Sequence, residues 1–369
     1  MPRILPSLLL SLALGCASKP ASTRGAAPPP AAVQEAPAGR FLTPAQMLER
    51  MEASPVKYEV REGDAPPGGW AEQLWPERVA PRLYPRVVVE EGVRTLAPHH
   101  DEPESQRLLQ EAEPHYQAGR LDEAAKLYAR ATEACPRCTD AWIFRGDAAL
   151  FSEKKEEALA HYRKASELNP DDYRGHFFQG HTLARMGRRA EAREAFASAL
   201  VLHPRLPTLR KLLAVNPQFG LVVTPDVVVP RGFAERTAGG VTVTFDGHYG
   251  TSWLAFAACK ALWLGEPSHR KELTGSESAG RFTSTEELEC LRAALIGYEA
   301  AKQRKDAEPP LRDEGLERLG KIVEAGMADA LVLFELAARV HPQATLTVDD
   351  ATRAKLRRYV LEYVLLERE

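Results

Sequence analysis

The sequence predicts a mainly α-helical protein, with three helical hairpins stacked into a solenoid and then a mostly helical C-terminal domain with a small β element. Two observations predict the solenoid: an internal repeat at a constant spacing, and recurring residues spaced to share one helical face. A single helical hairpin cannot bury its apolar face, so tandem hairpins stack on one another. A third observation, β-branched residues after position 221, predicts the β element. The period is marked by Pro136, Pro170 and Pro204; Ala124, Ala158 and Ala192; Tyr128, Tyr162 and Phe196; and Ala131, Ala165 and Ala199.

Small residues recur with the same period, at Ala112, Gly146 and Gly180. Together with Trp142, in the second unit, this pattern resembles the tetratricopeptide repeat family over roughly residues 105–206. We expect Gly146 to face Ala158 across its hairpin, because small side chains let two helix axes approach to about 8 to 10 Å. The resemblance implies a curved array that binds other proteins.

The resemblance also implies a concave groove lined by the first helix of each hairpin. Leu109 and Glu113 replace the lysine and asparagine with which the family clamps carboxylate tails, so binding of such tails is not expected. Two alternatives remain open. The groove binds an apolar or extended segment of another protein, or it is filled by this chain's own residues 41–104 or C-terminal helices. Transferred by register, the lining residues are Leu109, Glu113 and Tyr116; Ile143, Asp147 and Phe151; and Arg174, Phe177, His181 and Arg185.

Residues 1–16 are similar to a bacterial lipoprotein signal peptide. An apolar run from Ile4 to Leu14 precedes Gly15 and Cys16. This run is too short for a membrane-spanning helix, which needs about 20 residues. The resemblance implies that lipid is attached to Cys16, and Ala17 after it favours the outer membrane. The alternative is an ordinary secretion signal with a chance cysteine.

Residues 17–40 are rich in alanine and proline and cannot bury a core, which predicts a disordered tether. The formal net charge is only -3, and charges of both signs are interspersed, so nothing indicates a nucleic-acid partner. Within the third unit, arginines outnumber acidic residues, so an acidic partner is one interpretation and a solvated helix face is the other.

Four cysteines remain besides Cys16, an even number that favours two disulfides in an exported protein. We favour the pairs Cys135 with Cys138 and Cys259 with Cys290. The first pair also has the spacing of a redox motif, although it lies in a turn between repeats rather than between a strand and a helix. Redox exchange, free thiols and metal binding remain the alternatives.

The other segments are predicted from local signals. Residues 41–104 form a transition segment, with a helix from Pro44 to Glu52 and strands at 57–60 and 86–93. Residues 105–218 form the solenoid with a capping helix at 209–215, and residues 219–369 form the C-terminal domain. In that domain we expect strands at 222–229 and 241–245 and a helix at 253–263. A helix capped by Ser284 and Glu287 follows, and then helices at 312–326, 327–340 and 348–367.

Motifs that carry chemistry are few. The histidines form no metal-binding pair by spacing, since His176 and His181 lie on different sides of their helix, and no cofactor or metal is expected. The sequence therefore indicates a lipid-anchored periplasmic scaffold that binds another envelope protein through its repeats. The alternative is an envelope enzyme whose C-terminal domain carries the activity. Its candidate site is the densest polar group, Asp246, His248, Tyr249, Thr251 and Ser252.

Overall fold

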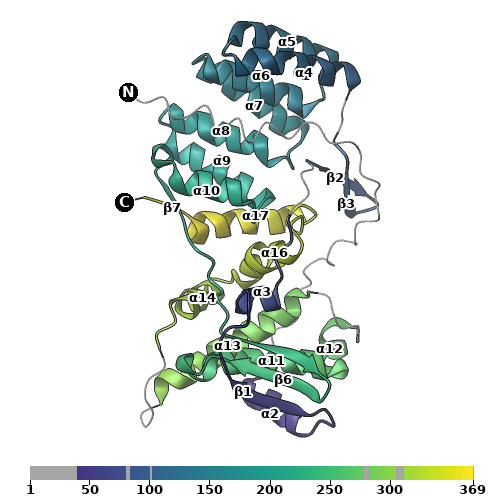
Figure 1. The fold of residues 1–369 in the computed structure, drawn as a ribbon, viewed down its shortest axis with the longest axis vertical. Helices are drawn as coiled ribbons and strands as arrows, with labels where there is room; N and C mark the ends of the chain where they lie inside the picture. Colours follow the sequence, from purple (N-terminus) through teal and green to yellow (C-terminus); the bar gives the residue numbers. More distant parts are fainter. Residues whose placement is uncertain (1–39, 80–83, 100–101, 278–281, 305–310, 369) are drawn as a thin grey trace.

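The computed structural model describes residues 40–79, 84–99, 102–277, 282–304 and 311–368. The molecule is elongated, with a helical array at one end and a mixed lobe of helices and strands at the other (Figure 1). The predicted signal peptide, Cys16 and tether residues 17–39 lie outside the described residues.

Three antiparallel helical hairpins form the array, as predicted. Their helices are followed by α10 (Pro207–Val215), which contains the predicted capping helix. The hairpins pair α4 (Pro103–Gln117) with α5 (Leu121–Ala134), α6 (Thr139–Phe151) with α7 (Lys155–Leu168), and α8 (Tyr173–Arg185) with α9 (Arg189–Leu202).

Glycine allows the two helices of the second hairpin to lie close together, and it does the same within the third hairpin. A Cβ atom on Gly146 would stand 2.5 Å from Cε1 of Tyr162, and one on Gly180 would stand 2.6 Å from Cδ1 of Phe196. Both rings are fully buried. The nearest atoms to Gly146 thus belong to the aromatic ring, whereas the sequence analysis expected Ala158 there. This contact explains why glycine and the aromatic residue recur with the same period.

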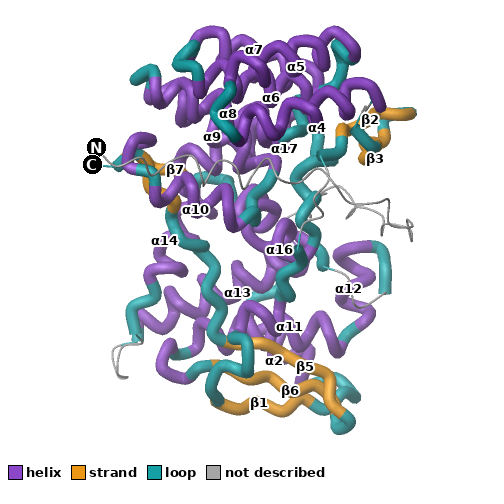
Figure 2. Tube along the Cα trace, turned by 45° about the horizontal axis from the view of Figure 1, so that its top comes forward, coloured by secondary structure: helices purple, strands orange, loops and turns teal. Residues whose placement is uncertain are grey.

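The lobe at the other end is built on a three-stranded sheet, seen in Figure 2 as the orange strands below the helices. The strand order is β1-β6-β5, formed by β1 (Tyr58–Glu62), β6 (Gly240–Phe245) and β5 (Gly232–Thr237). β1 runs parallel to β6, and β5 runs antiparallel to it. The sequence analysis predicted β1 and β6 but placed no strand at 232–237.

Helix α11 (Thr251–Gly265) is the centre of the lobe. It packs on β5 and β6 and also against α13 (Ser284–Gln303), so it is almost entirely buried. Helix α2 (Pro44–Glu52) packs against α11, and Trp70 of α3 (Trp70–Leu74) contacts the ring of Phe233. The early part of the predicted transition segment therefore belongs to the lobe.

The remaining C-terminal elements connect the lobe to the array. Helix α12 (Pro267–Thr274) follows α11, and α14 (Glu314–Glu324) follows α13. A continuous helix over 328–340 comprises α15 (Ala328–Leu331), π-helical turns and α16 (Ala338–Val340). Helix α17 (Asp350–Tyr359) then leads through η5 (Val360–Val364) into β7 (Leu365–Glu367).

Three details of this region correct the sequence analysis. Strand β4 (Leu221–Val223) pairs with β7 and ends at Val223, so the predicted strand at 222–229 is mostly loop. The predicted last helix ends at 364, where the pairing with β4 begins. Thr283, not Ser284, caps α13, because its side chain accepts a hydrogen bond from the Glu286 backbone N–H.

Residues 84–99 form a hairpin beside the array (Figure 1). Strands β2 (Arg86–Glu90) and β3 (Val93–Ala97) pair antiparallel, where the sequence analysis predicted a single strand. Its turn uses Gly92 at φ 80°, a left-handed conformation that glycine adopts without strain. The hairpin is attached to the third unit, because the Val87 backbone N–H donates to the Asp171 carboxylate at 2.9 Å.

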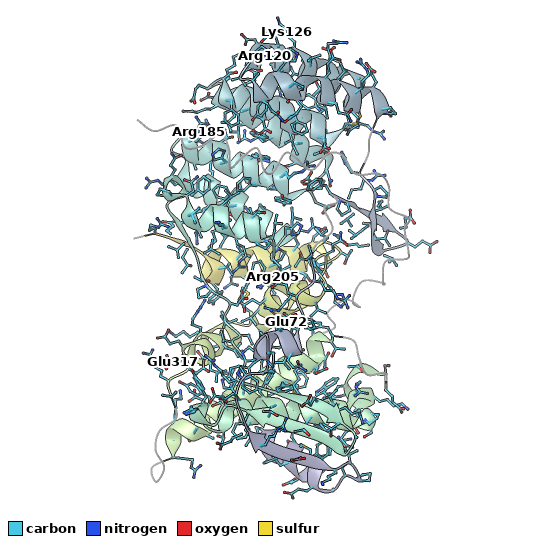
Figure 3. All side chains as sticks on the ribbon, in the orientation of Figure 1. Glu72, Arg120, Lys126, Arg185, Arg205 and Glu317 are labelled. Atoms are coloured by element: carbon cyan, nitrogen blue, oxygen red, sulfur yellow. A yellow bond between two sulfur atoms is a disulfide. The ribbon has the colours of Figure 1, made fainter. Side chains whose placement is uncertain are left out.

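The open end of the array is covered by the last helix of the chain, which lies beneath α10 in Figure 1. Arg193 of α9 donates through Nε to the Leu365 carbonyl at 3.0 Å, and Arg353 of α17 pairs with Asp171 at 2.8 Å. Arg205, at the level of the junction in Figure 3, pairs with Asp226 at 2.6 Å. An uncovered end would expose apolar surface, so these contacts end the stack.

Both favoured disulfides are present in the structure. Cys135 and Cys138 are joined in the turn between α5 and α6, and Cys259 and Cys290 join α11 to α13. All four of these cysteine side chains are buried. Within the described ranges, every helix is too short or too polar to cross a bilayer.

Candidate functional site

The first helices of the three hairpins, α4, α6 and α8, carry the ten residues assigned to the groove from the sequence. Their burial divides the groove in two. Four residues remain half-buried, namely Glu113, Tyr116, Phe151 and Arg185. The other six are buried, namely Leu109, Ile143, Asp147, Arg174, Phe177 and His181.

The third unit is closed by the chain itself. Phe219, in the short helical turn η2 (Pro217–Phe219), places its ring 5.7 Å from the ring of His181 and 4.6 Å from that of Phe196. Phe177, whose ring lies 5.7 Å from that of Phe196, is only 2% exposed. The expectation that Phe177 is available to a partner is therefore wrong. The chain itself packs on this unit through Phe219, a residue outside both segments that were expected to fill the groove.

Arg174 is also unavailable to a partner. Its guanidinium lies 3.4 Å from the centre of the Tyr84 ring, and it pairs with Asp140 at 2.5 Å and Asp172 at 2.7 Å. Two carboxylates more than balance one cation, so the buried site presents no excess positive charge.

Other arginines of the third unit are paired in the same way. Arg185 pairs with Glu153 at 2.5 Å, and Arg188 pairs with Glu191 at 2.5 Å. These contacts weaken the interpretation that an acidic partner binds the third unit, because these positive charges are already matched within the chain.

The part of the groove over the first two units is different, because aromatic rings remain at its surface. Tyr116 and Phe151 lie edge to face with ring centres 5.6 Å apart. The buried Asp147, whose charge acts on Tyr116, accepts a hydrogen bond at Oδ1 from the Tyr162 hydroxyl at 2.6 Å. Aromatic rings near a hydrogen-bonded carboxyl group form a surface suited to an extended protein segment.

Burial raises the pKa of Asp147 to about 7, and the nearby charge of Glu113 acts in the same direction. The hydrogen bond from Tyr162 and the charge of Arg174 oppose this shift. Burial likewise raises the pKa of Tyr116, so this hydroxyl stays protonated at neutral pH. The groove thus contains a carboxyl group that titrates near neutrality.

The polar group considered for catalysis closes a turn between β6 and α11. The Asp246 carboxylate caps η3 (Gly247–Tyr249), where Oδ1 accepts from the His248 backbone N–H at 3.1 Å and contacts its ring Nδ1 at 2.9 Å. The side chain of His248 is 83% exposed. Ser252 donates to the Tyr249 carbonyl, and Thr251 donates to that of Gly297. These are turn and capping contacts, not a buried, convergent pocket.

The structure also contains a buried charged network that the sequence analysis did not identify. Lys260 of α11 donates to Glu287 at 2.6 Å and to Glu286 at 2.9 Å, and Trp75 donates to Glu287 at 3.0 Å. The signal was Lys260 itself, a lone cation within the apolar run at 253–263. Its role here is to join α11, α13 and the segment after α3. Across the described part of the chain, no group of three potential metal ligands comes together.

Antiparallel helical hairpins that repeat at a constant spacing and leave one lined face define a helical-repeat protein. A tetratricopeptide repeat model matches residues 109–173 and 145–207 in two overlapping copies. Residues 109–207 therefore carry tetratricopeptide repeats, and the chain after residue 207 lies outside the match.

Several solved structures are similar to the array. The Arabidopsis OM64 tetratricopeptide domain is 20% identical over 29% of this chain and 89% of its own, with a TM-score of 0.28. The first such domain of Spaghetti (RPAP3), bound to an HSP90 peptide, is 20% identical over 31% of this chain and 90% of its own, with a TM-score of 0.29. The Yersinia enterocolitica type III secretion chaperone SycD, in complex with a peptide of the translocator YopD, is 18% identical over 32% and 92%, with a TM-score of 0.30. Among curated proteins, none matches this chain.

Proposed function

We propose that this protein is a scaffold of the bacterial cell envelope, held on a membrane by lipid at Cys16, that binds another envelope protein through the first two repeats. One observation carries the binding half of the proposal. Tyr116 and Phe151 stay half-buried at the surface of the groove, whereas the chain's own Phe219 closes the third unit. Aromatic side chains are favoured at protein interfaces because they combine large contact area with little conformational entropy.

A photo-crosslinking amino acid at position 151 tests the binding site in cells. We expect an adduct with another protein, and no such adduct from position 111, which is exposed on the opposite face of α4. Equal adducts from both positions, or crosslinks only within the chain, would count against the groove as the binding site.

The anchor is supported by the lipoprotein-like sequence that ends at Cys16. A Cys16→Ala variant should move from the membrane pellet to the soluble fraction, because multiple acyl chains give stable anchoring and this variant would have none. Unchanged sedimentation would refute the anchor while leaving the groove proposal intact.

A further inference from the structure

A buried hydroxyl group in the first repeat has no hydrogen-bond partner within the described residues. Tyr128 is 0% exposed and its Oη is unpaired. Tyr162 holds the same position in the next repeat and donates to Asp147. By the same register Glu113 corresponds to Asp147, yet Glu113 accepts from the Gln117 side chain at 2.8 Å. An unpaired buried hydroxyl costs free energy, so this group, near the groove residues Glu113 and Asp147, indicates that a polar partner is missing.

The groups around this hydroxyl are acidic. The charges of Glu113 and Asp147 both raise the pKa of Tyr128, as does burial, which is the larger effect. The same two carboxyl groups and Tyr128 act on Tyr116. We call Glu113, Tyr116, Tyr128, Asp147 and Tyr162 the tyrosine–carboxylate cluster. The cluster itself contains two acidic residues and no cation.

The two arginines whose charge acts on the cluster, Arg174 and Arg185, form their ion pairs with carboxylates outside it. Arg185 is paired with Glu153 at the rim of the groove, and Arg174 is paired with two aspartates. The carboxyl groups of Glu113 and Asp147 thus form no ion pair with either arginine.

Aromatic rings complete the site. Tyr116 and Phe151 lie edge to face, and the charges of Glu113 and Asp147 act on Tyr116. Aromatic faces attract ammonium and guanidinium groups. Such cations supply several N–H donors, which carboxylate and tyrosine hydroxyl oxygens accept. An anionic guest would be repelled by Glu113.

We propose that the groove takes a lysine or arginine side chain from the partner, held against Tyr116 and Phe151 with its charged end toward Glu113 and Asp147. This inference rests on the proposed function and specifies the chemistry of the segment that binds. The groove would thus bind a positive charge through acidic residues, whereas a carboxylate clamp binds a negative charge through basic residues.

An array of random dodecapeptides, probed with the purified, fluorescently labelled full chain, tests this specificity. We expect the bound peptides to be enriched in lysine and arginine relative to the array. Replacing the required basic residue of the best binder by glutamine should weaken binding about tenfold in fluorescence anisotropy, as for loss of a charge-assisted hydrogen bond.

Protein variants then locate the contact. Glu113→Gln should weaken the best binder by a similar factor and should remove the preference for the basic peptide over its glutamine version. Glu111→Gln removes the same charge from the opposite face of α4 and should leave affinity within twofold. Equal effects of the two variants, binders without basic enrichment, or no binding by any peptide would each overturn the proposal.

The crosslink at position 151 separates this inference from the proposed function. If the crosslinked partner segment lacks lysine and arginine, the scaffold function stands and the basic guest is refuted. The opposite result is that position 151 captures no partner while the peptide array still yields basic binders that depend on Glu113. That result would support the preference for a basic side chain and would refute the proposed binding of an envelope protein.

Discussion

Asp147→Asn is expected to change how the stability of the protein depends on pH. The folded-state pKa of Asp147 is about 7 because the carboxyl group is buried, against an ordinary value of 3.8. Between these values the folded state keeps the proton and the unfolded state releases it. The free energy of unfolding therefore falls as pH rises from about 4 to about 7 and is unaffected by this group above that range.

The size of the effect follows from the shift. Roughly three pKa units at about 1.36 kcal/mol each correspond to about 4 kcal/mol. Asparagine does not titrate, and its side-chain oxygen can still accept the hydrogen bond from Tyr162. The stability of Asp147→Asn relative to the wild type should thus rise by up to about 4 kcal/mol between pH 4 and pH 8.

Urea unfolding of both proteins at pH 4, 6 and 8, with the disulfides intact, measures this difference. Other buried acids such as Glu335, whose pKa burial also raises to about 7, contribute equally to both proteins and cancel. Glu111→Gln provides a control in which an exposed carboxylate is removed, and its curve should stay parallel to that of the wild type. A parallel curve for Asp147→Asn would refute the argument that burial holds this proton.

Three further substitutions test the packing. Gly146→Ala should destabilise the protein by about 1 to 3 kcal/mol in urea unfolding, because the new methyl group meets the tyrosine ring 2.5 Å away. Replacing Cys259 and Cys290 together by serine should cost about 4 kcal/mol in the same assay, the chain-entropy value for a sequence separation of 31. Phe219→Ala should cost about 3 to 5 kcal/mol and should increase hydrogen exchange in α8, because the ring that closes the third repeat is removed.

Each of these three predictions has a control or an outcome that would contradict it. Gly239→Ala, at a position with nothing within 4 Å, should be close to neutral, and an equal cost at both glycines would contradict the contact in the second hairpin. Wild-type stability unchanged by reduction would contradict the contribution of the second disulfide. Unaltered exchange in α8 after the Phe219 substitution would show that this ring does not close the groove.

The array could be predicted because its determinants repeat. Each hairpin must satisfy the same packing, so Gly146 and Tyr162 recur in the next unit as Gly180 and Phe196. The lobe lacks such redundancy. The pairing of β1 with β6 joins segments far apart in the chain, and no local pattern specifies a partner at that separation.

The sequence predicted which residues lie on the groove face of each helix, but it did not predict which of them are exposed. Register places Arg174 and His181 on the correct helix face, yet Tyr84 covers the first and Phe219 packs on the second, and both of these come from outside the hairpins. Phe219 and Tyr84 belong to a turn and a loop whose positions depend on the assembled tertiary structure. Burial of a polar residue such as Asp147 likewise depends on neighbours from other helices, which spacing within one helix cannot reveal.

The placement of β1 has a consequence for how the protein is made. Tyr58 of β1 lies opposite Val241 of β6. The ribosome makes β1 first, so this strand can pair with β6 only after the whole array has been synthesised. The array is thus inserted within the lobe, and a truncation that removed residues before 104 would expose one edge of β6. We infer that the repeats can fold as they emerge from the ribosome, whereas the lobe completes its sheet only after them.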